Sequence, residues 1–184
     1  ESVRLGYQKL AKGWQKGRAV NMEIKLDNEL DELPTDRAVW LFGWENRFRS
    51  LFDNALSDYD YAKKESGVSI EDTEMKRDKH SVVIMGRHPS NSAHALAWLA
   101  TDNVSAMPGL GRKLPHYNKY SYLGFTGDEP TNVFKGQWPV VNSPMSIAIS
   151  QEDGEEVGPI TAKLTPRSAL AQLPPVFSEA RMLK

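Results

Sequence analysis

The 184-residue sequence contains no cysteine. This absence excludes a thiol nucleophile, a disulfide framework and thiolate metal ligands. The sequence also lacks any apolar run close to the roughly 20 residues that a membrane-spanning helix needs. We therefore expect no membrane span in this chain.

An excess of charge of either sign is also missing. The chain has 23 basic and 24 acidic residues, with a formal net charge of -1. Such a balance does not draw a whole chain to nucleic acid or to an acidic membrane. The segment 112–122 mixes basic and aromatic residues in a way that can stack bases, but its few basic residues are countered by Asp128 and Glu129. We expect no nucleic-acid partner.

Two short apolar runs dominate the first part of the chain, "AVWLFG" at 38–43 and "SVVIMG" at 81–86. Their continuous apolar character is typical of strands buried on both faces. Residues 48–56 follow the first run with an apolar stripe at helical spacing, and "HPSNSAHALAWLATDN" at 88–103 follows the second with an Ala/Leu-rich stripe. The pattern predicts an α/β fold, with a layered sheet of mostly parallel buried strands flanked by helices.

The remaining segments predict smaller elements. Residues 67–80 read as an exposed hairpin with a turn at Glu71-Asp72, and residues 120–125 and 145–150 read as further strands. An acidic turn at 151–159 and an irregular C-terminal arm follow. Residues 2–14 predict a short amphipathic helix that connects to an upstream domain. We expect a connector over residues 1–18, a single α/β domain over 19–184, and a longer parent protein.

Polar residues follow the predicted strands at the positions where open parallel sheets bind ligands. If the strands are parallel, these residues share one crevice, and imidazole with carboxylates suits acid–base or metal chemistry. The alternative is that they cap helices and fill turns, as polar residues do at strand ends in any such fold. The candidate crevice residues are Glu45, Arg87, His88, Asp128 and Glu129.

Searches for complete catalytic motifs give nothing. The sequence contains no H-E-x-x-H zinc motif, no G-x-S-x-G nucleophile elbow and no G-x-x-x-x-G-K-[ST] phosphate loop. His80 and His88 lie at opposite ends of one predicted strand, too far apart to share a metal. We expect no catalytic residue, no metal ligand and no cofactor in this chain.

Four segments together resemble the C-terminal region of bacterial aminopeptidase N-like zinc metallopeptidases. They are "DRAVWLFGWENRF" (36–48), "RHPSNSAHALAWLATDN" (87–103), "PGLGRKLPHYNKYSYLGFTGDEPTNVFKGQWPVVNSP" (108–144) and "LPPVFSEARM" (173–182). In that family, an H-E-x-x-H helix and a downstream glutamate hold zinc in a separate catalytic domain. None of those positions exists here, so no site residue is carried over.

The resemblance implies a noncatalytic accessory domain that stabilises the parent or shapes access to its active site. It implies an upstream catalytic domain as partner, zinc and peptide substrate only through that parent, and a periplasmic or exported location in a Gram-negative bacterium. Within the stretch 114–144, the large side chains of Tyr117, Phe134 and Trp138 form a candidate docking surface for the catalytic body. The alternative is that this stretch only covers the sheet.

Two other functions remain open. One is an independent small hydrolase-like or ligand-binding domain that uses Glu45, His88 and Asp128 at the strand ends. The other is an interaction module that assembles oligomers.

Overall fold

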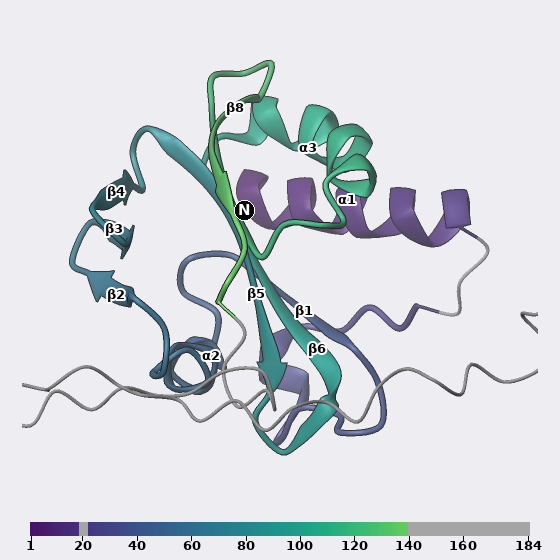
Figure 1. Cartoon of the computed structure of the whole chain (residues 1–184). Coiled ribbons are helices and arrows are strands. Elements are labelled where there is room, and N and C mark those ends of the chain that lie inside the picture. Colours follow the sequence, from purple (N-terminus) through teal and green to yellow (C-terminus); the bar gives the residue numbers. More distant parts are fainter. Residues whose placement is uncertain (19–21, 140–184) are drawn as a thin grey trace, which may run out of the picture. The chain divides into compact units, whose positions relative to one another are not determined.

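The computed structural model describes residues 1–18 and 22–139 (Figure 1). The chain divides into the units Glu1–Val141 and Asn142–Lys184, and the fold below is that of the first. Its elements are α1 (Ser2–Arg18), the 3-10 helix η1 (Asp27–Glu29), β1 (Val39–Phe42), α2 (Arg49–Asn54), β2 (Tyr61–Lys64), β3 (Gly67–Ile70), β4 (Thr73–Lys76), β5 (His80–His88), β6 (Asn91–Ala100), η2 (Val104–Ala106), α3 (Met107–Lys113), η3 (Leu114–His116), β7 (Tyr122–Thr126) and β8 (Thr131–Gly136).

The strands form two separate sheets. The larger has the order β1-β6-β5-β7-β8, and only its β1–β6 pair is parallel. The smaller sheet, β2-β3-β4, is wholly antiparallel. The large sheet is therefore mixed and mostly antiparallel.

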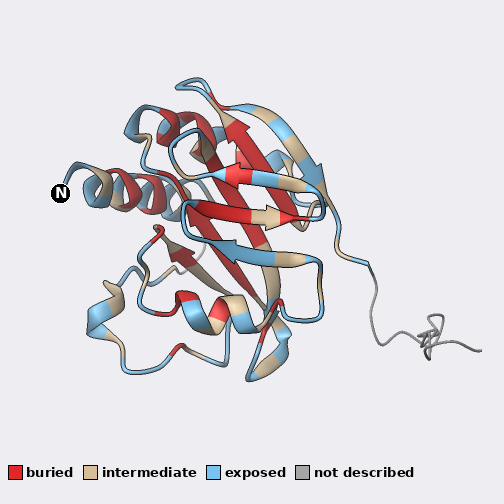
Figure 2. Ribbon diagram, turned by 90° about the vertical axis from the view of Figure 1, so that its left-hand side faces the viewer, coloured by how far each residue is buried: buried red, intermediate tan, exposed pale blue. Residues whose placement is uncertain are grey.

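The central strands of the large sheet are buried on both faces (Figure 2). Successive side chains of a strand point to opposite faces, so Val82 and Ile84 enter one apolar cluster while Val83 enters another. In β6, Trp98 joins the first cluster and Leu99 the second. The first unit thus has three layers, with a core on each side of the sheet.

Helices α1 and α3 cover one face of the sheet and lie side by side there (Figure 1). Tyr7 and Leu10 of α1 and Leu110 of α3 are buried in the cluster that also holds Val83 and Leu99. The predicted N-terminal helix is confirmed, and it packs on the sheet. Its role as a connector to an upstream domain stays a prediction.

Helix α2 and the small sheet contribute to the core on the other face. Phe52 of α2 and Val68 of β3 are fully buried there with Trp98. The guanidinium carbon of Arg49 lies 3.6 Å from the centre of the Trp98 ring. Arg49 also donates to Asp53 at 2.7 Å and to the Tyr61 hydroxyl at 2.7 Å, so a buried polar cluster joins α2, β2 and the central sheet.

Two predictions about the architecture are wrong. The sheet is not mostly parallel, and residues 88–103 contain no helix. They contain β6, which returns antiparallel to β5 after a turn at Pro89 and Ser90. The run "ALAWLA" at 95–100 looks helical because Ala and Leu favour helices. Burial on both faces overrides this preference, because a strand between two cores also needs a continuous apolar run.

Other predictions are confirmed. The strands at 38–43 and 81–86, the helix after the first of them, the hairpin with its turn at Glu71-Asp72 and the strand at 120–125 are all present. The hairpin is not exposed as expected, because Val68, Ile70 and Met75 are buried in the core. The strand at 145–150, the acidic turn, the C-terminal arm and the segment 173–182 lie outside the described residues. Across the described ranges, no helix is both long and apolar enough to cross a membrane.

We expect Asp53→Ala to destabilise the fold by about 3 kcal/mol, because Arg49 is left buried without its carboxylate partner. Urea unfolding monitored by tryptophan fluorescence measures this loss. Asp58→Ala is the control, since Asp58 is exposed and such changes usually cost less than about 0.5 kcal/mol. Equal losses in the two variants would contradict a stabilising role for the cluster.

Candidate functional site

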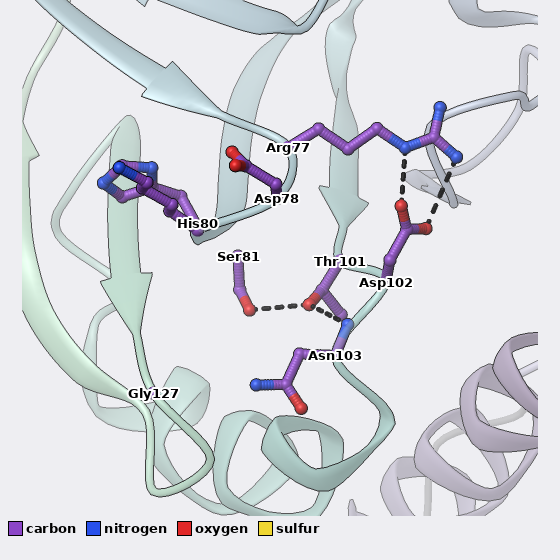
Figure 3. A pocket seen from close by; sticks show the side chains of 9 residues that line it. Arg77, Asp78, His80, Ser81, Thr101, Asp102, Asn103 and Gly127 are labelled. Carbon is purple, nitrogen blue, oxygen red and sulfur yellow. Dashed lines mark hydrogen bonds and ion pairs between the residues drawn. The ribbon is translucent and has the colours of Figure 1, made fainter.

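A polar pocket of about 260 Å³ lies at one edge of the large sheet (Figure 3). It forms where the loop between β4 and β5, the end of β6 and the turn between β7 and β8 meet. Three parts of the chain that are far apart in sequence therefore supply its side chains. The lining residues are Arg77, Asp78, Lys79, His80, Ser81, Thr101, Asp102, Asn103 and Gly127.

Two buried hydroxyl groups lie in this pocket. The Ser81 hydroxyl donates to Oγ1 of Thr101 at 2.7 Å, and both residues are buried. The main chain of Thr101 is held by the Tyr7 hydroxyl, which accepts from the Thr101 N–H and donates to its carbonyl, each at 2.7 Å. Burial raises the pKa of Tyr7. Helix α1 is thereby fixed to the main chain of a residue that lines the pocket.

Arg77 forms one wall and is bound to two carboxylates. Its Nε donates to Asp102 at 2.5 Å, and another guanidinium N–H donates to Glu45. The hydrogen bond to Asp102 is the main reason that the pKa of Arg77 lies above its ordinary value. Arg77 thus ties the β4–β5 loop to the residues that follow β1 and β6.

Asn103 joins the pocket to the turn between β7 and β8. Its amide donates to Asp128 at 2.9 Å, while its side-chain oxygen accepts from the N–H of Ala106 and caps η2. Gly127 lies in this turn with φ +81°, a left-handed conformation that glycine adopts without strain. The turn is therefore held by both its backbone and Asp128.

The arrangement suits hydrogen bonding to a small polar molecule better than bond cleavage. Nδ1 of His80 accepts from the Lys76 N–H at 2.9 Å, and Ser81 donates to Thr101 instead of to an imidazole. A serine nucleophile needs a base within hydrogen-bond reach. Among the described residues, no group of three or more His, Asp or Glu side chains is placed to hold a metal ion.

The structure divides the candidate crevice residues between two edges of the sheet. Glu45 follows β1, and Asp128 and Glu129 follow β7, so all three lie at the edge with the polar pocket. Glu45 pairs with Arg77, and Glu129 lies 3.3 Å from Arg112. These acidic groups have partners within the fold.

Arg87 and His88 end β5, which runs opposite to β1, so they lie at the other edge. Arg87 donates to the carbonyl of Ser92 at 3.2 Å. His88 is only 2% exposed, and its Nδ1 accepts from the N–H of Ser90. The structure therefore does not bring His88 together with Glu45 and Asp128.

The candidate docking residues are also separated, because they pack on opposite faces of the sheet. Tyr117 packs edge-on against Phe125 in the core beneath α1 and α3. On the other face, Phe134 stacks on Tyr122, and Trp138 packs on the same tyrosine and donates to the carbonyl of Met85 at 2.7 Å. All three side chains close the cores and do not share one surface.

The residues that line the pocket are not among the predicted site residues. Ser81 and Thr101 do carry a signal, since each is the polar residue that bounds an apolar run. The pairing of Val82 with Ala100 places them together. That pairing can be inferred only after 91–100 is recognised as a strand. Arg77 belongs to the hairpin that the sequence predicts to be exposed, and nothing in its local sequence distinguishes it from the neighbouring lysines.

Comparison with known proteins adds no relative. No family model, no curated protein and no solved structure matches this chain. The resemblance to aminopeptidase N-like enzymes therefore stays a prediction from sequence.

We expect Tyr7→Phe to cost about 1–3 kcal/mol at neutral pH, because the buried N–H and carbonyl of Thr101 lose their partner. The pKa of Tyr7 is raised in the fold, so its contribution to stability is present below about pH 10 and is lost as the pH rises further. As the pH rises, the free energy of unfolding should therefore fall less steeply for Tyr7→Phe than for the wild-type protein, by up to about 1.4 kcal/mol per pH unit. Urea unfolding from about pH 9 to pH 11 tests this, and an unchanged slope would contradict it.

Proposed function

We propose that this chain is a noncatalytic accessory domain of a larger zinc aminopeptidase-like metallopeptidase. In that parent it stabilises the catalytic domain or shapes access to the active site. Zinc and peptide substrate are bound by the parent.

One structural observation carries the proposal. Three charged side chains at the pocket are bound to one another, since Arg77 donates to Asp102 and Glu45, and the Asn103 amide donates to Asp128. Catalytic acids and bases need to reach a substrate. Groups engaged in this way join loops and strand ends and so stabilise the fold, as we expect for a noncatalytic domain. The four segments that resemble the metallopeptidase family support the same proposal.

A second candidate function is the binding of a small polar ligand at the strand ends. The pocket lined by Ser81, Thr101 and Asn103 favours it, because several donors and acceptors converge in one cavity. Acetate, methylammonium and glycine are suitable probes, since they present a carboxylate, an ammonium and both. Saturable shifts of the Ser81, Asn103 and Gly127 amide signals, lost in Asn103→Leu, would support this candidate over the first.

The accessory role predicts that the isolated chain is inactive. Purified with one equivalent of Zn²⁺, it should hydrolyse aminoacyl p-nitroanilides no faster than buffer. Metal-dependent turnover that survives rigorous repurification would overturn the proposal.

The reading frame upstream of Glu1 provides the positive test. It should encode H-E-x-x-H, and deletion of this chain should make the parent lose activity at a lower temperature or change its KM for longer peptides. A frame without that motif, or a parent indifferent to the deletion, counts against the accessory role.

A further inference from the structure

An apolar groove of about 600 Å³ is lined by residues of α1, η2 and α3 (Figure 1 shows α1 and α3). Leu5 and Val104 line it with 45% and 37% of their surfaces exposed. Trp14 forms part of the lining, and its ring N–H donates to the carbonyl of Gly111 at 3.0 Å. The groove is thus a shaped apolar surface whose walls are fixed by packing.

Two glycines of α1 line this groove, and the fold explains only one of them. A Cβ on Gly6 would come within 2.3 Å of the Met107 sulfur, so a larger residue there would force the Met107 side chain to move. A Cβ on Gly13 would meet no atom within 4 Å. Gly17, outside the lining, is equally open, so what distinguishes Gly13 is its place in the groove, where the missing side chain lets a partner approach the helix closely.

The charged residues of α1 are all basic, and Glu1, which precedes the helix, is paired with Arg4. Helix α1 carries Arg4, Lys9, Lys12, Lys16 and Arg18 and no acidic residue. Lys9 lines the groove itself, and Lys16 follows it seven residues later on the same side of the helix. Both lysines are exposed. A matching occupant therefore presents acidic groups next to an apolar surface.

We propose that the groove between α1 and α3 binds an amphipathic helix of a partner protein that carries acidic residues beside its apolar face. An elongated apolar groove between two helices fits a third helix, whose side chains at i, i+3, i+4 and i+7 enter it. A basic amphipathic helix can also lie on an anionic membrane. Here, however, Tyr7, Leu10 and Ala11 of α1 are buried against the body of the fold, so its main apolar face cannot insert into lipid. The proposal holds whether or not the chain belongs to a peptidase.

Selection from a random displayed library tests the proposal without a known partner. The probe is a library of peptides of about 16 residues, more than four helical turns, selected on the immobilised full chain. We expect the selected peptides to combine apolar residues at helical spacing with Asp or Glu. Absence of enrichment, or enrichment of peptides without this pattern, overturns the proposal.

Paired variants then locate the binding site. Gly13→Leu fills the groove and should weaken the selected peptides about tenfold or more, while Gly17→Leu, one turn beyond the lining residues, should change binding by less than about twofold. Both exchange an exposed helix glycine for a better helix former, so folding is preserved. Equal effects of the two variants contradict binding in the groove.

Charge-reversal variants test the contribution of Lys9 and Lys16 to binding. Lys9→Glu with Lys16→Glu should weaken the acidic peptides, and the loss should shrink as salt is raised and screens the charges. Lys63→Glu with Lys64→Glu changes the net charge by the same amount but lies on β2 of the small sheet, so it should not weaken binding of the peptides. Weakening by both pairs alike would show a nonspecific charge effect and contradict the proposal.

The Gly13→Leu variant also tests two other possible occupants of the groove, a membrane and a second copy of the chain. Cosedimentation with vesicles of phosphatidylcholine and phosphatidylglycerol that Gly13→Leu abolishes would assign the groove to a membrane. A dimer in sedimentation equilibrium that Gly13→Leu dissociates would assign it to a second copy of the chain. Either result overturns the proposal. A monomer that ignores vesicles and binds the acidic peptides supports it.

Discussion

Burial of β5 and β6 on both faces is the constraint on which the rest of the structure depends. Residues Val82–Ile84 and Leu96–Ala100 are all buried, with alternate side chains in separate cores. A strand pair of this kind needs an apolar cover on each side. The helices α1 and α3 supply one cover, and α2 with the small sheet supplies the other. Every other element flanks this pair in the sheet, covers it, or connects the parts.

Polar contacts then fix each cover to the sheet in a defined position. On one side, Arg49 lies over the Trp98 ring while it binds Asp53 and Tyr61. On the other, the Tyr7 hydroxyl binds both backbone groups of Thr101. Apolar packing alone tolerates sliding of layers, whereas these directional contacts specify one arrangement. Since Thr101 also lines the polar pocket, the same contact holds α1 and the pocket together.

The sequence predicted elements better than their pairing. Short apolar runs at 38–43 and 81–86 were recognised as strands because burial on both faces leaves no polar residue in them. The run at 95–100 meets the same condition, but its Ala and Leu residues favour a helix, and local sequence does not say which preference prevails. The prediction of a helix at 95–100 leads to the wrong prediction of a mostly parallel sheet. Parallel strands would have placed Glu45 and His88 at one edge, whereas the antiparallel return of the chain puts them at opposite edges.

The parallel pairing of β1 with β6 has a consequence for the order in which the fold is acquired. The β5–β6 hairpin closes through a turn at Pro89 and Ser90, whereas Val39 must find Leu96 across the whole intervening segment. Short loops close at lower entropic cost, so we expect the hairpin to form before β1 docks. On the ribosome, α1 and β1 emerge first and yet have no sheet to join until β6 has been synthesised. We therefore expect the N-terminal part of this unit to be synthesised before the rest and to complete its folding last.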